Sequence, residues 1–215
     1  LNAIYALQGK FITKKELAYN AIEVEQNIIK EAVGSQDQVA TAYGGFNYTE
    51  FSKENEFSVY PFKFIKKNLD ELQKHFLLCF TGLTRNARDV AATQIELTKS
   101  NLLNLNDVMA ICDDGYKCLS NNQSHISEIG YLLDQQWRIK KNLTKLISNN
   151  HIDEIYELGK KNGAIGGKLL GAGGGGFMLF IAPPDCHSRI IKALPKQMFV
   201  PFKLDFEGSK IVYHS

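Results

Sequence analysis

The most conspicuous candidate for chemistry in the sequence is a glycine-rich segment, GGKLLGAGGGGFMLFIAPP, at residues 166–184. Within it, residues 171–176 satisfy the literal pattern G-x-G-x-x-G of loops that bind the pyrophosphate of a dinucleotide. That fingerprint also needs a strand before the glycines, a helix after them and an acidic residue about 20 positions further on. Here the apolar run FMLFIA predicts a strand after the glycines, and position 196 is occupied by lysine. The dinucleotide interpretation therefore fails on its context.

Other interpretations of the glycine segment meet different obstacles. A Walker phosphate loop does not fit, because Gly167-Lys168 is followed by Leu169 rather than by Ser or Thr. A flexible joint does not fit either, since KLL and FMLF on the two sides are suited to burial. Glycines in an apolar context usually mark a close approach of two backbones, or of a backbone and a ligand. Because successive N–H groups can also form an anion-binding nest, a tight structural turn and a phosphate-proximal loop both remain open.

Three charged residues are further candidates, each with an ordinary structural explanation. Asp37 lies in GSQDQ, and an Asp after Gly-Ser is most commonly a turn or cap residue. Glu25 lies on the helical pattern just before it, where an exposed position is the usual one. Arg85 follows Gly-Leu-Thr near the start of a predicted helix, and arginine can bind a phosphate in bidentate fashion. None of the three carries a function by itself.

Composition narrows the classes of function. With 215 residues the chain is long enough for one large domain or two small ones. A net charge of +2 is too small to predict nucleic acid or an anionic membrane as a partner. The four cysteines form no C-x-x-C pair, which argues against zinc and fits free thiols in a reducing cytoplasm. No apolar run approaches the roughly 20 residues of a membrane-spanning helix, and no signal peptide is recognisable.

Hydrophobic periodicity predicts the elements that must position these residues, and the mixture indicates an α+β fold. Helices are predicted at about 1–8, 13–34, 85–100, 104–120, 124–148, 152–161 and 185–194. Strands are predicted in GGFNYTEF, FSVYPFKFI, KHFLLCFTG, FMLFIA, MFVPFKLDF and KIVYHS. Thr13 and Glu16 have the spacing of a capping box, and Asp185 is the predicted N-cap of the last helix. Lys140 interrupts the otherwise apolar face of helix 124–148.

The glycine segment and GSQDQ together resemble the GHMP kinases, which are named for galactose, homoserine, mevalonate and phosphomevalonate. KLLGAGGGGFMLF resembles the third motif of that family, and GSQDQ with GGFN resembles the acidic segment that faces the acceptor hydroxyl. Further segments, among them FTGLTRNA and VPFKLDFEGSKIVY, are similar to the branch that phosphorylates D-glycero-D-manno-heptose 7-phosphate. The resemblance implies the two-domain fold of the family. Residues 1–73 would belong to an S5-like N-terminal domain and residues 74–215 to a ferredoxin-like C-terminal domain.

The resemblance also implies site residues, with ATP and Mg²⁺ as cofactors and a small sugar phosphate as substrate. Asp37 would take or orient the proton of the attacking hydroxyl, and Glu25 would be a Mg²⁺ ligand. Arg85, Ser148, Asn149 and Lys168 would contact the substrate, although Ser148 and Asn149 can equally cap a helix and Lys168 can equally be solvated. The expected phosphate and active-site loop consists of Gly171, Ala172, Gly173, Gly174, Gly175 and Gly176.

One motif of the family has no counterpart in the sequence. The phosphate loop of the type P-x-x-x-G-L-G-S-S normally precedes a helix resembling LNAIYALQGK, so the chain is expected to resemble the C-terminal two-thirds of such a kinase. Two alternatives stay open beside a heptose-phosphate kinase acting at the anomeric hydroxyl. One is a fucose- or galactose-type kinase of the same family, and the other is a catalytically inactive module that binds a sugar phosphate. A homo-oligomer is left open as well.

Overall fold

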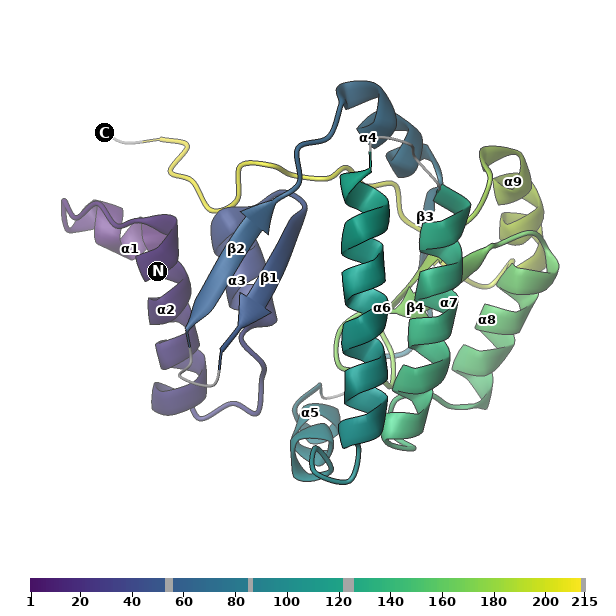
Figure 1. Cartoon of the computed structure of the whole chain (residues 1–215), viewed down its shortest axis with the longest axis horizontal. Coiled ribbons are helices and arrows are strands. Elements are labelled where there is room, and N and C mark those ends of the chain that lie inside the picture. The colour runs from purple at the N-terminus through teal and green to yellow at the C-terminus, as the bar shows by residue number, and fades with distance from the viewer. Residues whose placement is uncertain (53–55, 85–86, 122–125, 214–215) are drawn as a thin grey trace. The chain divides into compact units, whose positions relative to one another are not determined.

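The computed structural model describes residues 1–52, 56–84, 87–121 and 126–213 (Figure 1). The chain forms two compact units, of which the first comprises Leu1–Phe62 with Leu204–Ser215 and the second comprises Lys63–Lys203. Helices and antiparallel strands occur in both units, which confirms the α+β class. The boundary between the two compact units therefore lies after Phe62, and the C-terminal residues belong to the first unit. The boundary between homologous domains, expected at 73/74, stays a prediction.

The first unit is built from helices and one β-hairpin. Its elements are α1 (Asn2–Leu7), α2 (Lys14–Ile22), a π-helical turn (Glu23–Ile28), α3 (Gln36–Tyr43), β1 (Asn47–Phe51) and β2 (Phe57–Pro61). The capping box is confirmed, since Thr13 Oγ1 accepts from the Glu16 N–H at 3.1 Å and the Glu16 carboxylate accepts from the Thr13 N–H at 2.8 Å. The hairpin is confirmed too, with Asn47 opposite Pro61 and Phe51 opposite Phe57.

The helix expected to continue to Gly34 changes its geometry and ends earlier. After Ile22 the chain winds into the π-helical turn, in which the Ile29 N–H donates to the Val24 carbonyl at 2.8 Å. Lys30 then takes a positive φ of 61°, a conformation that a side chain disfavours and that ends the helix. The apolar pattern does not indicate the π-helical turn, because a single wider turn barely alters the spacing of the apolar residues.

A small core holds the first unit together. Leu17 and Ala18 of α2 pack with Val39 and Ala42 of α3 and with Phe57 of the hairpin. The C-terminal segment adds backbone bonds to the end of α3: the Gly45 N–H donates to the Asp205 carbonyl at 2.7 Å, and the Ser209 N–H donates to the Thr41 carbonyl at 2.9 Å. These bonds make residues 205–209 part of the first unit.

Both C-terminal strand predictions need correction. In MFVPFKLDF only Met198–Phe199 (β6) forms a strand, because Pro201 has no N–H with which to continue the ladder. In KIVYHS, residues 210–213 form no strand, and no neighbouring strand pairs with them in the described part of the chain. Val212 and Tyr213 are 85% and 80% exposed. Apolar, β-branched residues alone do not make a strand where no partner edge is available.

The second unit is a four-stranded antiparallel sheet with helices (Figure 1). Its strands are β3 (Phe76–Phe80), β4 (Gly166–Leu169), β5 (Phe177–Ile181) and β6, in the order β4-β5-β3-β6. Its helices are α4 (Lys66–Lys74), α5 (Ala87–Glu96), α6 (Leu102–Ser120), α7 (Ile126–Leu143), α8 (Asn150–Lys161) and α9 (Pro184–Ala193). The strands predicted in KHFLLCFTG and FMLFIA are confirmed as β3 and β5, whereas α4 and β4 were not predicted.

The predicted N-cap of the last helix is wrong. Pro183 occupies the N-cap position of α9, Pro184 is the first helical residue, and Asp185 lies inside the first turn. Proline suits that position because its fixed φ is helical and its missing N–H is not needed there. Asp185 instead places a negative charge near the N-terminal end of the helix dipole.

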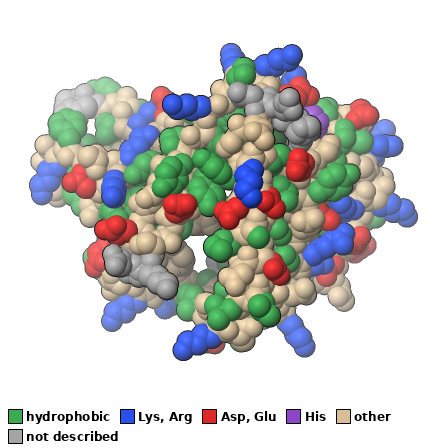
Figure 2. Space-filling model, in the orientation of Figure 1, with side chains coloured by type: hydrophobic (Ala, Val, Ile, Leu, Met, Phe, Trp, Pro, Cys, Tyr) green, Lys and Arg blue, Asp and Glu red, His purple; other side chains and the backbone are tan. Residues whose placement is uncertain are grey.

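The core of the second unit lies between the sheet and its helices. Trp137 of α7, Ile155 of α8, Phe180 of β5 and Ile190 of α9 are at most 2% exposed and belong to one hydrophobic cluster. Cys79 is completely buried in the same cluster, which confirms its expected role as a small apolar residue. Lys and Arg side chains are scattered over the face drawn in Figure 2, in agreement with their scattered positions in the sequence.

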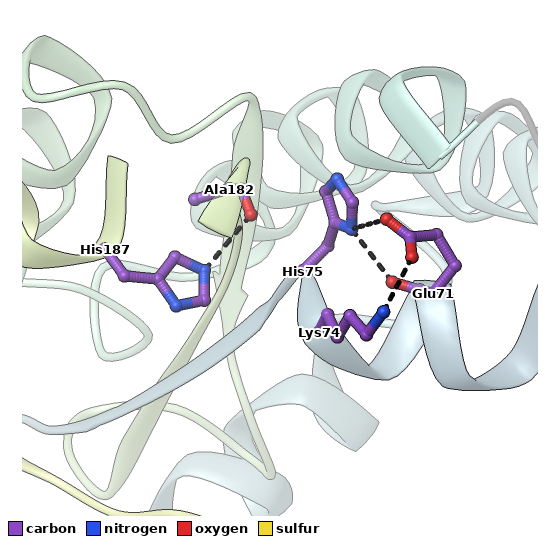
Figure 3. A network of polar contacts seen from close by, with 5 residues as sticks. All are labelled: Glu71, Lys74, His75, Ala182 and His187. Atoms are coloured by element: carbon purple, nitrogen blue, oxygen red, sulfur yellow. Dashed lines mark hydrogen bonds and ion pairs between the residues drawn. The ribbon is translucent and has the colours of Figure 1, made fainter. Parts of the chain in front are cut away.

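Two histidines secure the end of β3 and β5 that is remote from the glycine segment (Figure 3). His75 Nδ1 lies 2.9 Å from the Glu71 carbonyl, and the Glu71 carboxylate also pairs with Lys74 at 3.2 Å. His187 Nε2 lies 3.1 Å from the Ala182 carbonyl. In the strand register this end pairs Phe76 with Ile181, whereas the glycine segment adjoins the opposite end. We therefore assign these histidines a structural role.

No helix among the described residues is long and apolar enough to cross a membrane.

Candidate functional site

In the first unit, the acidic segment forms the start of a helix rather than a simple turn. Asp37 is the second residue of α3, and its side chain is exposed. Ser35 stands at the N-cap but makes no side-chain capping bond. A carboxylate in the first turn is favourable because it faces the positive end of the helix dipole. Asp37 is therefore an exposed carboxylate on a fixed helical backbone.

The residue that follows Asp37 in the motif is buried rather than exposed. Gln38 is only 6% exposed, and its Nε2 donates to Glu25 Oε2 at 2.6 Å. This bond connects α3 with the π-helical turn that carries Glu25. A second amide makes a parallel connection, because Gln26 Nε2 donates to the Val33 carbonyl at 3.0 Å and to Ser35 Oγ at 3.1 Å. The segment around Asp37 and the turn around Glu25 are thus fixed to each other.

The donor set around Glu25 suits Mg²⁺ rather than a metal held by protein ligands alone. Among the described residues, no group of three or more His, Cys, Asp and Glu side chains could hold a metal ion. Mg²⁺ commonly uses one or two carboxylates, keeps several waters and takes the rest of its ligands from substrate phosphates. Gln38 Oε1, beside Glu25, is buried and has no hydrogen-bond partner in the described structure. A carboxylate next to an unused acceptor therefore fits a hydrated Mg²⁺.

In the second unit, the glycine segment is the connection between β4 and β5. Gly174 N–H donates to the Ile147 carbonyl at 2.8 Å, and Gly176 N–H donates to the Leu83 carbonyl at 2.9 Å. A Cβ on Gly173 would lie 2.8 Å from Ile147 Cα, and one on Gly175 would lie 2.7 Å from the Leu83 oxygen. The close approach of two backbones is thereby confirmed. A strand follows the glycines, as expected, and the dinucleotide interpretation stays excluded.

Side chains from two helices hold the first residues of this loop. Lys140 Nζ of α7 donates to the Gly171 carbonyl at 2.5 Å, and Gln94 Nε2 of α5 donates to the Ala172 carbonyl at 2.8 Å. Sequence reasoning gave neither residue a role. The position of Lys140 on an apolar helix face was a usable signal, because a lysine there needs a partner for its ammonium group. Gln94 offered no signal, since its partner lies 78 positions away.

Two more residues fix the far end of the loop. Thr81 Oγ1 donates to the Gly176 carbonyl at 2.9 Å, and His151 Nε2 lies 2.9 Å from the Thr81 carbonyl. In the described structure the N–H groups of Ala172, Gly173 and Gly175 have no protein acceptor. The carbonyls at the two ends of the loop are thus engaged, while several of its N–H groups are available. N–H groups can only donate hydrogen bonds, so the ligand that suits this arrangement is an acceptor such as a negatively charged oxygen.

The remaining predicted contact residues lie in the second unit, and each has a structural partner where it is described. Asn149 is the N-cap of α8, with its Oδ1 accepting from the Ile152 N–H at 3.1 Å. Ser148 Oγ donates to Asp153 Oδ1 at 2.9 Å. The capping alternative is confirmed for Asn149, whereas Ser148 bonds a side chain of the same helix, and substrate contact by either residue stays a prediction. Arg85 lies outside the described residues.

Lys168 of β4 is not simply solvated. Its Nζ donates to Gln136 Oε1 of α7 at 2.7 Å, and burial lowers the pKa of the Lys168 ammonium from its ordinary value. Gln136 lies one helical turn before Lys140, so the same face of α7 binds both β4 and the glycine loop. A role of Lys168 toward substrate stays a prediction.

Similarity to known proteins agrees with these features. Residues 120–200 match the family described as GHMP kinases C terminal. D-glycero-alpha-D-manno-heptose 7-phosphate kinase of Campylobacter jejuni is 34% identical over 186 residues, which are 85% of this chain and 54% of that protein. The bifunctional fucokinase/GDP-fucose pyrophosphorylase of Arabidopsis thaliana is 30% identical over 69% of this chain and 14% of that protein.

A solved structure extends the similarity to the fold. The crystal structure of a D-glycero-D-manno-heptose 1-phosphate kinase from Bacteroides thetaiotaomicron superposes with a TM-score of 0.68 at 25% identity, over 99% of this chain and 60% of that one. The chain therefore spans little more than half the length of the heptose-phosphate kinases it matches. With the family match, the sequence similarity and the fold in agreement, the chain belongs to the GHMP kinases.

Proposed function

We propose that this chain is part of an ATP-dependent kinase that phosphorylates D-glycero-D-manno-heptose 7-phosphate at its anomeric hydroxyl. The observation that carries the proposal is the hydrogen bond that the buried Gln38 amide donates to Glu25 at 2.6 Å. It connects the Glu25 carboxylate with the helix on which Asp37 is an exposed carboxylate. Similarity to heptose-phosphate kinases over most of the chain supports the choice of substrate.

Asp37 would act on the nucleophile. Phosphoryl transfer asks the protein chiefly to position the attacking hydroxyl and to stabilise the charge on the transferred group. A carboxylate can accept or orient the hydroxyl proton if it comes within hydrogen-bond reach of the acceptor. The exposure of Asp37 leaves it available to a bound sugar, and its place in the first turn of α3 restricts its position.

Glu25 would hold Mg²⁺, together with phosphate oxygens and water. Bound there, the ion supplies positive charge that offsets the charge of the nucleotide phosphates. The contribution of the protein is orientation, because the Gln38 amide fixes one oxygen of Glu25.

The glycine loop would donate hydrogen bonds to phosphate oxygens. Its available N–H groups at Ala172, Gly173 and Gly175 suit an anion, and Lys140 and Gln94 keep the neighbouring carbonyls engaged. Gly171, Gly174 and Gly176 complete the loop, with their positive φ angles of 69°, 78° and 97°. Lys168, Ser148, Asn149 and Arg85 are proposed to contact the sugar phosphate.

The test uses the natural protein that carries this sequence, purified and incubated with ATP and Mg²⁺. We expect ³¹P NMR to show a new phosphate ester at the anomeric carbon when D-glycero-D-manno-heptose 7-phosphate is the acceptor. Omission of the sugar is the control for hydrolysis of ATP alone. ATP consumption that does not exceed this control would contradict the proposal.

A fucose-type kinase is the second candidate, because the Arabidopsis fucokinase relative is 30% identical over 69% of the chain. The same assay separates the two candidates when fucose and galactose are offered beside the heptose phosphate. A kcat/KM for fucose that exceeds the value for the heptose phosphate would favour the second candidate.

A further inference from the structure

We propose that Gln38 is a positioning residue for the metal site: its amide N–H fixes Glu25, and its carbonyl oxygen accepts a hydrogen bond from a water molecule bound beside that carboxylate. The inference rests on the proposed function, in which Glu25 holds Mg²⁺. It concerns a residue of GSQDQ to which neither the motif nor the similarity gives a role.

The first observation is the contact itself. Gln38 is 6% exposed and donates from Nε2 to Glu25 Oε2 at 2.6 Å, across 13 positions of the sequence. A buried glutamine has a high desolvation cost unless its polar atoms are bonded. A hydrogen bond to a carboxylate is one of the stronger kinds, and it restricts the rotation of the Glu25 side chain.

The second observation is that the other polar atom of the Gln38 side chain has no partner. Gln38 Oε1 is buried and has no partner in the described structure. Buried acceptors in folded proteins nearly always have a donor, whether from protein, water or ligand. Since the amide nitrogen is committed to Glu25, its carbonyl oxygen is oriented by the same bond and requires a donor close to that carboxylate.

The third observation is the unusual backbone under Glu25. Residues 23–28 form a π-helical turn, and Lys30 has a positive φ of 61°. Single π-helical turns are frequent at functional sites. A strained backbone persists where the surrounding structure holds it, and strained residues cluster at ligand sites. Here the bonds made by Gln26 and Gln38 hold the turn.

A hydrated Mg²⁺ supplies the missing donor. The ion keeps several waters, each of which has protons to donate. Residues that orient a metal ligand or its waters typically contribute 10–100-fold to metal affinity. Gln38 can orient both the metal ligand and a metal-bound water. Its amide nitrogen donates to the Glu25 carboxylate, and its carbonyl oxygen is available to accept from the water.

The experiment measures metal binding rather than turnover. Mn²⁺ is titrated into the natural protein in complex with a non-hydrolysable ATP analogue, and free Mn²⁺ is followed by electron paramagnetic resonance. We expect Gln38→Leu to weaken Mn²⁺ binding by about 10–100-fold. Gln36→Leu is the matched control, because it makes the same change on the same helix at an exposed side chain, and we expect wild-type affinity. Glu25→Gln should weaken binding at least as much as Gln38→Leu.

The outcomes separate the inference from the proposed function. If Glu25→Gln weakens Mn²⁺ binding and Gln38→Leu does not, the inference about Gln38 is wrong while the metal site stands. If neither variant changes the affinity, both the inference and the metal site are wrong. Binding of the analogue in the absence of metal reports on folding. If Gln38→Leu weakens this binding as much as it weakens Mn²⁺ binding, Gln38 has only a structural role. Gln38→Met, which is unbranched like glutamine, replaces Gln38→Leu if the latter does not fold.

Discussion

Asp37 and Gln38 are neighbours in the sequence, and yet only one of them was recognisable from it. The proposed role of Asp37 came from the resemblance of GSQDQ to a family motif, since its residue type alone equally suits a turn or a cap. Gln38 is buried against Glu25, 13 positions earlier, and nothing in its residue type indicates that partner. Residues whose function depends on a distant contact are therefore the ones that sequence reasoning misses. Thr81, Gln94 and His151 of the second unit are of the same kind.

The thiol groups give a prediction at the scale of single residues. Burial raises the pKa of Cys79 to about 12, so the reactive thiolate is nearly absent near neutral pH. Cys112 is exposed, although burial of its sulfur also raises its pKa. We expect iodoacetamide to label Cys112 in the native protein and Cys79 only after denaturation. Peptide mass spectrometry checks this, and native labelling of Cys79 at the rate of Cys112 would contradict the burial.

At the scale of elements, the sequence predicted most helices and the strands that flank the glycine loop. Apolar periodicity was sufficient for α7 and α8, because each has buried residues that pack against the rest of its unit. It was also sufficient for α6, although this helix has no fully buried residue. It was insufficient for β4, whose GGKL contains two glycines and little β-propensity. A Cβ on Gly166 would overlap the Gly130 carbonyl of α7, so close packing rather than propensity explains this strand.

The glycine loop gives a first prediction at this scale. Gly173 has a φ of 119°, and a Cβ there would lie 2.8 Å from Ile147 Cα. We expect Gly173→Ala to lower the free energy of unfolding by about 1–3 kcal/mol, measured in urea. Gly115→Ala is the control, because its Cβ would meet only Leu132 at 4.0 Å. An unchanged urea midpoint in Gly173→Ala would contradict the described packing.

The side chains that hold the loop give a second prediction. Lys140→Met and Gln94→Leu each remove a donor to a loop carbonyl while keeping most of the side-chain volume. We expect faster hydrogen–deuterium exchange in a peptide covering residues 170–176, because the loop loses an anchor. Lys161→Met changes an exposed lysine of α8 and should leave this exchange unaltered. If exchange is the same in all the variants, the prediction is wrong, and the backbone contacts of the glycines are sufficient to hold the loop.

At the scale of the whole molecule, the sequence predicted the family and the α+β class but not the path of the C-terminal residues. The strand-like composition of MFVPFKLDF and KIVYHS suggested two strands. Where these two segments meet, residues 205–209 instead bind the end of α3 through backbone bonds. Gly44 and Gly208 allow this, since a Cβ on either would overlap the backbone of the other. Such a pairing depends on chain topology, and local patterns carry no information about it.

Stability against alkali is a prediction for the folded chain as a whole. Burial, together with the hydrogen bond to Asp134, raises the pKa of Tyr156 above its ordinary value near 10. The folded state therefore retains this proton above pH 10 while the unfolded state loses it. The associated stability is complete below pH 10 and is lost as the pH rises further. We expect Tyr156→Phe to flatten the fall of thermal stability above pH 10, with Tyr131→Phe, at an exposed position of α7, as the control.

The central claim is that Asp37 acts on the acceptor hydroxyl in phosphoryl transfer. The most direct measurement compares kcat for wild type, Asp37→Asn and Asp70→Asn in the natural protein, with ATP and D-glycero-D-manno-heptose 7-phosphate as substrates. Asp70 lies exposed on α4 and provides the same chemical change away from the candidate residues. We predict that Asp37→Asn lowers kcat by about 10²–10⁴-fold with an unaltered melting temperature, and that Asp70→Asn retains full activity. A wild-type kcat in Asp37→Asn would contradict the account.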